Sequence, residues 1–334
     1  MKGMKRGLVA TMSLLLSSAC GGELNVADAG DASPDVSVPC DVPCTATPPS
    51  TAACIGGRCI VTLASGGSQP WGLAVDGAYV YWSDRGLGSG QIMKVPMQGG
   101  PSTVLATNQS SYPVAIDGDS VYWDTAERGV MKLSKLGGTP VALSGSPWPG
   151  EFGFGIAVDA ASVYWVDSYG SGFVKKVPRD GGAVTTLADN IIPAMITLDA
   201  TSVYYTTYDG NVIKADLDGA NPVILASGPA DATGIAVDAA NVYWTNTGMG
   251  TVMQVSRNGG TPITLSTGDG AAAIAVDATS VYWVGGAFAV KKVAIGGGTV
   301  TSFPAGRGAG IVVDDTSVYW TDIDNRTVMK ATPK

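Results

Sequence analysis

Seven aspartates recur along this sequence at a nearly constant spacing, each at the end of a short apolar run. They are Asp76, Asp117, Asp159, Asp199, Asp238, Asp277 and Asp314. A ring of carboxylates could bind a metal ion or transfer protons. The local pattern also fits a structural role, because an Asp at the first position of a tight turn accepts hydrogen bonds from the backbone. Since two residues follow each Asp before the next apolar segment begins, we predict turn capping at all seven positions.

Histidine is absent from the 334 residues. Acid–base catalysis near neutral pH would therefore need a carboxylate or a lysine with a strongly shifted pKa. The apolar runs before the aspartates consist mainly of Gly, Ala, Val and Ile, which supply no converging carboxylates for calcium. We therefore predict no catalytic residues, no metal site and no cofactor.

Short strands must position these residues. The segment from Gly155 to Asp189 contains four runs rich in Val, Ile, Tyr, Trp or Thr, separated by turn-forming residues. We predict strands at Gly155–Asp159, Ser162–Val166, Phe173–Val177 and Val184–Leu187.

The second strand of this unit carries a Val-Tyr-Trp tripeptide that the chain repeats, once as Val-Tyr-Tyr. The copies begin at Val80, Val121, Val163, Val203, Val242, Val281 and Val318, 37 to 42 residues apart. A period near forty with four strands per unit is typical of a β-propeller, whose blades bury their faces against one another. We predict an all-β fold: a seven-bladed β-propeller of four-stranded antiparallel blades. Small residues in each first strand fit the crowded axis, and Tyr and Trp fill the wider wedge between blades.

The chain ends after the third strand of the seventh unit. Residues 60–66 read like a fourth strand, so we predict that this N-terminal strand completes the last blade and closes the ring. The propeller domain would then span residues 59–334. Lysines recur on the third strands, and we predict that they form a solvated outer edge with their stems lying on the blade. They are Lys94, Lys132, Lys176, Lys214, Lys292 and Lys330.

Residues 1–19 have a basic start, an apolar run from Leu8 to Leu16 and small residues before Cys20. This pattern predicts a signal peptide of the lipoprotein type, and Ala19-Cys20 resembles a bacterial lipobox, although Ser17 stands where a Leu is usual. A lipid on Cys20 would tether the protein to a membrane without a spanning segment. Plain secretion is the alternative.

Residues 20–58 are predicted to be a disordered spacer with a disulfide-stapled end, because their first part is poor in apolar residues and rich in Asp, Ala, Pro, Ser and Thr. Four cysteines in an exported chain predict two disulfides, with three possible pairings. These are Cys40, Cys44, Cys54 and Cys59. The close pair Cys54 and Cys59 suggests a hairpin staple, and a zinc site is the less favoured alternative because paired C-x₂-C clips are missing.

The charge of the chain excludes some partners. The formal net charge is −8, and cleavage of the leader would remove Lys2, Lys5 and Arg6, leaving about −11. Such a field repels nucleic acid and anionic head groups. We therefore expect neither as a partner.

The seventh unit contains Tyr319-Trp320-Thr321-Asp322, the YWTD tetrapeptide. The repeats thus resemble the YWTD propellers of low-density-lipoprotein receptors, and the whole chain resembles the Cys-stalked propeller lipoproteins of myxobacteria and related bacteria. The other copies lack the full tetrapeptide, and YWTD propellers have six blades where seven are counted here. The resemblance implies binding of proteins or other extracellular partners, without chemistry.

One face of the predicted disc carries variable loops, which connect strands two and three and cross between blades. Variable loops on a rigid repeat are where function is usually placed. The crossings into the first four blades carry the predicted ligand-binding residues Trp71, Tyr112, Trp148, Phe152, Phe154 and Met195. Later crossings carry small residues, so we expect a funnel mouth that is aromatic on one side. Alternatively, Trp148 simply caps the channel.

Two functions remain open. The first is a membrane-anchored, extracytoplasmic binding or scaffold protein, monomeric, which engages a protein or glycan on the variable face. It would sit in the bacterial cell envelope as an outer-membrane lipoprotein facing the periplasm or the exterior. The alternative is a propeller hydrolase or lyase with an axial, calcium-dependent site, which the absence of histidine disfavours.

Overall fold

The computed structural model describes residues 43–86, 90–109, 111, 113–125, 129–145, 154–168, 170–228, 231–268, 270–285 and 288–334. Within these ranges the regular structure consists of β-strands, with no α-helix. Accordingly, no membrane-spanning helix occurs in this part of the chain.

The strands form seven antiparallel sheets, the blades, which are numbered here in chain order. The first strands of blades 1 to 7 are β3 (Pro70–Val75), β7 (Val114–Ile116), β11 (Gly155–Val158), β15 (Pro193–Leu198), β19 (Ala232–Val237), β23 (Ala271–Val276) and β27 (Gly308–Val313). The second strands are β4 (Tyr79–Asp84), β8 (Ser120–Thr125), β12 (Ser162–Asp167), β16 (Ser202–Thr207), β20 (Asn241–Asn246), β24 (Ser280–Gly285) and β28 (Val318–Asp322). The third strands are β5 (Gln91–Pro96), β9 (Gly129–Ser134), β13 (Phe173–Pro178), β17 (Asn211–Asp216), β21 (Thr251–Ser256), β25 (Ala289–Ala294) and β29 (Thr327–Thr332). The fourth strands are β6 (Thr103–Thr107), β10 (Val141–Ala142), β14 (Thr185–Asp189), β18 (Val223–Ser227), β22 (Ile263–Ser266), β26 (Thr301–Pro304) and, in blade 7, β2 (Arg58–Ala64).

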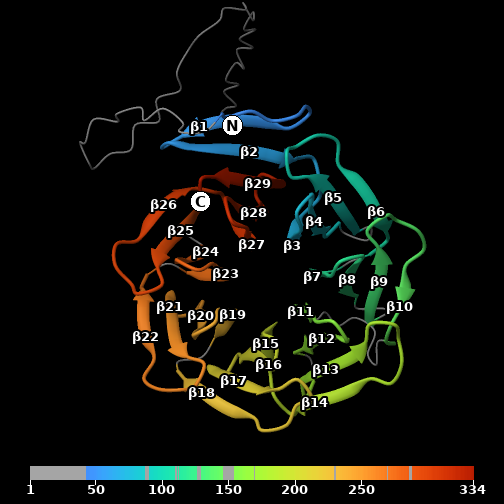
Figure 1. Cartoon of the computed structure of the whole chain (residues 1–334), viewed down its shortest axis with the longest axis vertical. Coiled ribbons are helices and arrows are strands. Elements are labelled where there is room, and N and C mark those ends of the chain that lie inside the picture. The colour runs from blue at the N-terminus through green and yellow to red at the C-terminus, as the bar shows by residue number, and fades with distance from the viewer. Residues whose placement is uncertain are drawn as a thin grey trace, which may run out of the picture. The chain divides into compact units, whose positions relative to one another are not determined.

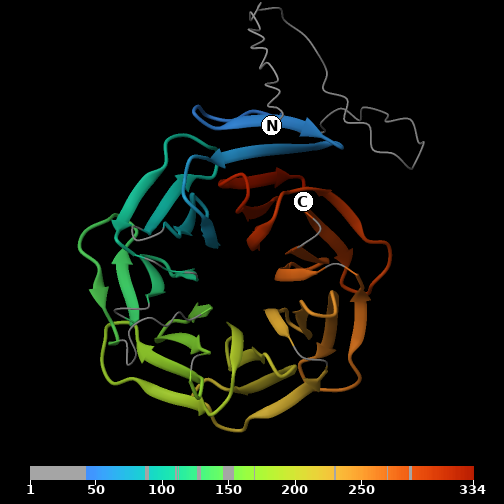
Figure 2. The same ribbon diagram turned by 180° about the vertical axis from the view of Figure 1, so that it is seen from behind.

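The blades follow one another around a ring, as Figures 1 and 2 show from its two sides. The first strand of each blade lies nearest the axis and the fourth lies at the rim. The predicted seven-bladed β-propeller is confirmed. Within blade 3 the observed strands differ from the predicted ones by at most two residues at any end.

The repeated Tyr-Trp pair explains how neighbouring blades hold together. Successive residues of a strand point to opposite faces, so Tyr and Trp of one second strand pack against different neighbours. Tyr81 of blade 1 shares a buried cluster with Trp123 of blade 2. Tyr319 of blade 7 shares one with Trp82 of blade 1, across the point where the ring closes. All seven junctions are built in this way, with Tyr205 in place of Trp at the junction of blades 3 and 4.

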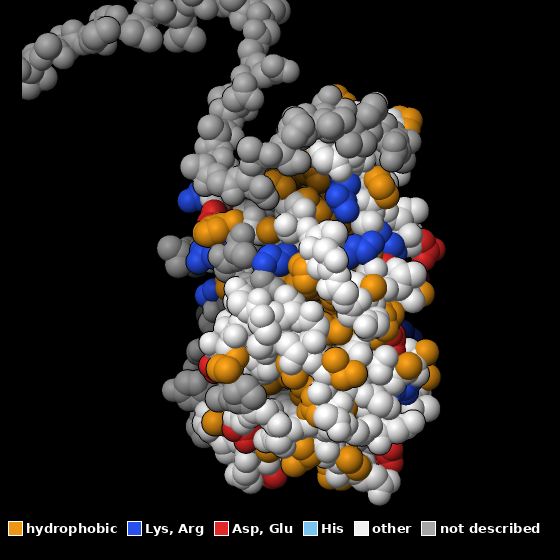
Figure 3. All heavy atoms as spheres, turned by 90° about the vertical axis from the view of Figure 1, so that its left-hand side faces the viewer, with side chains coloured by type: hydrophobic (Ala, Val, Ile, Leu, Met, Phe, Trp, Pro, Cys, Tyr) orange, Lys and Arg blue, Asp and Glu red, His pale blue; other side chains and the backbone are white. Residues whose placement is uncertain are grey.

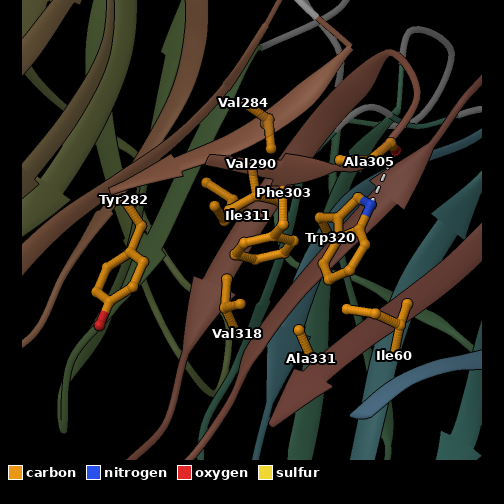
Figure 4. Close-up of a cluster of buried hydrophobic side chains, with 10 residues drawn as sticks. All are labelled: Ile60, Tyr282, Val284, Val290, Phe303, Ala305, Ile311, Val318, Trp320 and Ala331. Carbon is orange, nitrogen blue, oxygen red and sulfur yellow. Dashed lines mark hydrogen bonds between the residues drawn. The ribbon is translucent and has the colours of Figure 1, made fainter. Parts of the chain in front are cut away.

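Figure 4 shows the cluster between blades 6 and 7. The rings of Phe303 and Trp320 lie 5.7 Å apart, edge to face. Trp320 Nε1 donates a hydrogen bond of 2.9 Å to the Ala305 carbonyl, so the buried indole leaves no unpaired donor. Ile60 of the ring-closing strand packs in the same cluster. The strand that closes the ring therefore contributes to the hydrophobic core.

The N-terminal strand closes the ring as predicted, since β2 pairs antiparallel with β29 and supplies the fourth strand of blade 7. The structure adds a strand that the sequence analysis missed. β1 (Thr51–Ile55) pairs with β2 and extends this blade to five strands. It falls within residues 20–58, which we had assigned to the spacer and its stapled end.

The hairpin staple between Cys54 and Cys59 is not formed. The two residues lie opposite each other in the β1–β2 pair, yet the disulfide joins Cys59 to Cys44, with a Cα–Cα distance of 4.9 Å. Opposite positions in a hairpin bring two cysteines close but do not by themselves select the partner. Cys54 is also disulfide-bonded. Cys20 and Cys40 lie outside the described residues.

The rim carries scattered apolar side chains. Val223 and Ile224 on β18 and Ile263 on β22 are more than half exposed. Figure 3, which views the ring edge-on, shows such side chains as separate small groups among polar atoms. Separate apolar residues are normal on the surface of a folded protein. The rim is therefore not the first candidate for a binding surface.

Candidate functional site at the propeller axis

A cavity of about 240 Å³ lies on the axis, where the first strands of all seven blades converge. Trp71, Phe154 and Met195 line it, so the structure brings together three of the six predicted ligand-binding residues. Each is half-buried. Tyr112, Trp148 and Phe152, the other three, lie outside the described residues. Pro113 and Ala273, which the sequence analysis did not single out, also line the cavity.

The lining is apolar on all sides but differs in size from one side to the other. Blades 1 to 4 contribute Trp71, Pro113, Phe154 and Met195, whereas blade 7 contributes Ala309. The aromatic side chains in the described lining, Trp71 and Phe154, come from blades 1 and 3, and the asymmetry of the whole mouth stays a prediction. The Arg85 guanidinium lies 5.7 Å from the centre of the Trp71 ring, a cation–π contact that supports the indole.

Hydroxyl groups on the second strands hold the inner strands in place. Thr321 Oγ1 of blade 7 accepts a hydrogen bond of 2.9 Å from the Gly310 amide and donates one of 3.0 Å to the Trp71 carbonyl of blade 1. Thr245 Oγ1 of blade 5 does the same, with distances of 2.8 Å to the Gly234 amide and 3.0 Å to the Ala272 carbonyl of blade 6.

These hydroxyls lie where the inner strands change register. The pairing of β19 with β20 shifts between Ala232 and Ile235, and that of β27 with β28 shifts between Gly308 and Ile311. A bulge leaves a backbone N–H without its ladder partner, and the hydroxyl takes that role. The Thr of the YWTD tetrapeptide is therefore a structural brace between blades. Its recurrence after the aromatic pair, at residues 206, 245 and 321, was the signal that could have identified it.

Glycine is required where the inner strands approach each other most closely. A Cβ on Gly234 would lie 2.5 Å from the Ala272 carbonyl oxygen, and one on Gly310 would lie 2.5 Å from that of Trp71. Real Cβ atoms do not come so close to a backbone oxygen. The small residues at the axis thus follow from backbone packing as well as from lack of space.

The seven aspartates lie at the opposite ends of the first strands, on the other face of the ring from Trp71. In blade 1, Asp76 Oδ1 accepts hydrogen bonds of 2.8 Å from the Ala78 and Tyr79 amides, and Oδ2 accepts one of 3.0 Å from Tyr81 Oη. The same turn and tyrosine bonds occur in all seven blades. The predicted turn capping is confirmed.

Four of these carboxylates also bind a cation from the next blade. Lys135 Nζ lies 2.8 Å from Asp76, Arg179 lies 2.5 Å from Asp117, Arg257 pairs with Asp199, and Lys334 lies 2.8 Å from Asp277. Burial raises the pKa of Asp76, but the hydrogen bonds from Lys135, the turn amides and Tyr81 outweigh it and lower the pKa to about 2. Burial and the adjacent carboxylate together raise the pKa of Tyr81 above its ordinary value. Asp76 is thus an ionised structural group at neutral pH.

The predicted solvated edge of lysines is wrong. Lys94 Nζ donates a hydrogen bond of 2.6 Å to the Lys135 carbonyl of the next blade, and Lys330 Nζ reaches the Met97 carbonyl across the ring closure at 3.2 Å. The equivalent lysines make the same bond at the other junctions that have one. They are half-buried, and burial lowers the pKa of Lys330. A third strand borders the next blade, so its long side chains reach backbone acceptors there.

The described residues contain no group of three or more Cys, Asp or Glu side chains placed to hold a metal ion. The polar chemistry of the aspartates is used for folding, and the axial cavity offers apolar contact. The arrangement is therefore suited to binding.

No family model matches the sequence, and no curated protein matches it. Solved structures resemble the fold. A streptogramin B lyase is 17% identical with a TM-score of 0.68, covering 82% of this chain and 96% of the lyase. The computationally designed protein Ika8 is 14% identical with a TM-score of 0.62, covering 82% and 98%. BamB from Moraxella catarrhalis is 16% identical with a TM-score of 0.58, covering 84% and 96%. At these identities the likeness concerns the fold alone.

Proposed function

We propose that this protein is an anchored, extracytoplasmic binding or scaffold protein that engages a protein or glycan on the face bearing its variable loops. The observation that carries the proposal is the axial cavity, where Trp71, Phe154 and Met195 meet as half-buried apolar side chains. Large apolar side chains that remain partly exposed around a depression are typical of binding surfaces.

Binding is preferred to catalysis because of the cavity's chemistry. Its described lining consists of apolar residues and glycine, without an ionisable side chain. A hydrolase or lyase would need an acid, a base or a metal ion in contact with the substrate. The propeller fold itself does not decide between these functions, since one fold carries many.

The anchor is the second part of the proposal. A lipid on Cys20 would place the propeller at the end of a spacer on the surface of a bacterial membrane, the outer membrane in our proposal, as a monomer. Mass spectrometry of the mature N-terminus tests it: we expect a diacylated or triacylated Cys20, and a chain cleaved elsewhere without a lipid would refute the anchor.

Site-specific photo-cross-linking in the native envelope tests the binding face. Met249, in the loop between β20 and β21, and Asn258, in the turn between β21 and β22, are exposed on opposite faces of blade 5. A photoreactive residue at 249 should cross-link a partner that the same residue at 258 does not, and Trp71→Ala should abolish this adduct. Equal adducts from both positions, or none from either, would contradict the proposal.

A further inference from the structure

The axial cavity is apolar in its side chains, and several backbone groups at its mouth are hydrogen-bonded within the protein. At the mouth, the Gly72, Gly234 and Gly310 amides donate to hydroxyls of their own blades. The Trp71, Thr233 and Ala272 carbonyls accept hydrogen bonds from Thr321, Thr206 and Thr245 of the preceding blades. These backbone groups at the mouth are thus already paired within the protein.

The size of the cavity limits the occupant. An apolar cavity of about 150 Å³ accepts a benzene molecule, so one of about 240 Å³ accepts a single larger ring or a branched aliphatic group. An oligosaccharide would exceed this volume, and the apolar side chains of the lining would offer its hydroxyls no hydrogen-bond partner, which is costly. The cavity therefore fits one neutral apolar group.

The surroundings of the mouth indicate what carries that group. Arg307 and Asp324, from two loops of blade 7 on the variable face, form an exposed ion pair of 3.2 Å. Arg326 is exposed beside them. These charged groups lie on the same face as the cavity, and Arg307 directly precedes β27, which lines it. Polar groups around a few central apolar anchors, which provide most of the affinity, are the usual anatomy of a protein–protein interface.

We infer that the partner is a protein that inserts one aromatic or branched aliphatic side chain from a loop into the axial cavity. The side chain enters past the small residues of blades 5 to 7 and packs against Trp71, Phe154 and Met195. This inference rests on the proposed function and narrows its partner from a protein or glycan to a protein with an apolar anchor.

The neutral fluorophore N-phenyl-1-naphthylamine is a suitable probe of the cavity. The test uses the full chain with Cys20→Ser, so that no lipid or detergent competes for the dye. We expect saturable one-site fluorescence enhancement, weakened at least tenfold by Ala309→Trp or by the milder Ala273→Leu, which fill the small side. Ile263→Trp, which adds an indole to the exposed rim, is the matched control and should not change the affinity. Maltotriose and chitotriose should not compete.

Several results would overturn the inference. The inference is wrong if the dye binds with unchanged affinity in both cavity-filling variants, or if Ile263→Trp weakens its binding equally. It is also wrong if the dye does not bind at all, or if an oligosaccharide displaces it. A final experiment tests whether the cross-linked partner supplies the apolar group in the cavity. If it does, saturating dye should prevent formation of the adduct from position 249. If the adduct persists, the partner still binds the variable face, but the inference that it inserts an apolar side chain into the cavity is wrong. If position 249 gives no adduct at all, the proposed function fails first.

Discussion

Thr321 braces the junction where the two ends of the propeller meet, and Thr321→Val should weaken that junction. Valine has nearly the same shape, so the change removes the hydroxyl without creating a cavity. The hydroxyl is fully buried and makes two hydrogen bonds, to the Gly310 amide and to the Trp71 carbonyl, a residue 250 positions away. Each bond contributes about 1 kcal/mol net, and an unpaired buried amide or carbonyl costs about 1–3 kcal/mol. We expect the free energy of unfolding to fall by about 2–4 kcal/mol.

Equilibrium urea denaturation of the full chain, followed by tryptophan fluorescence, measures this loss. Thr321→Ser is the matched control, because it keeps the hydroxyl and loses only one methyl group, worth about 1 kcal/mol. Thr316→Val is the second control, since its hydroxyl lies in an exposed turn. If Thr321→Val cost no more than Thr316→Val, the hydroxyl would not brace the blades and the reasoning would be refuted.

Three further predictions concern stability. Replacing Cys44 and Cys59 together by Ala opens a disulfide of sequence separation 15 and should lower the free energy of unfolding by about 3 kcal/mol. The same denaturation measures this loss, and an unchanged midpoint would contradict it. The Asp76 carboxylate, with its pKa lowered to about 2, stabilises the fold fully above its unfolded pKa of about 4, so its share of the stability should be lost as the pH falls from about 4 through 2, and Asp76→Asn should flatten this part of the pH profile. Gly234→Ala should lower the thermal midpoint by several degrees, because the new Cβ would lie 2.5 Å from the Ala272 carbonyl oxygen; a midpoint within one degree of the wild type would show that the strands can separate without cost.

The fold could be predicted from the sequence because its information is local and repeated. Each unit carries the residues that define its own strands and turns. A Val-Tyr-Trp tripeptide, and an Asp separated from the next strand by two residues, therefore suffice to count the blades. Ring closure followed from the same counting, since the last unit lacked a strand that residues near Ile60 could supply. The turn role of Asp76 and its equivalents was local as well.

What could not be predicted depends on contacts between blades or between distant segments. The lysines such as Lys94 donate to a carbonyl of the next blade, and this acceptor exists only once the blades are assembled. The disulfide partner of Cys59 is chosen by where the segment before β1 runs. The strand β1 forms because β2 offers it an open edge.

The same distinction applies to the candidate site. The sequence placed Trp71, Phe154 and Met195 on crossings at one face, but their meeting around a single cavity results from the convergence of seven first strands on one axis. The sequence by itself determined how many blades this protein has and which residues cap their turns, because those depend on neighbours along the chain. Only the tertiary structure decided that the Trp71 and Ala272 carbonyls at the axis are hydrogen-bonded, because those bonds cross from one blade to the next.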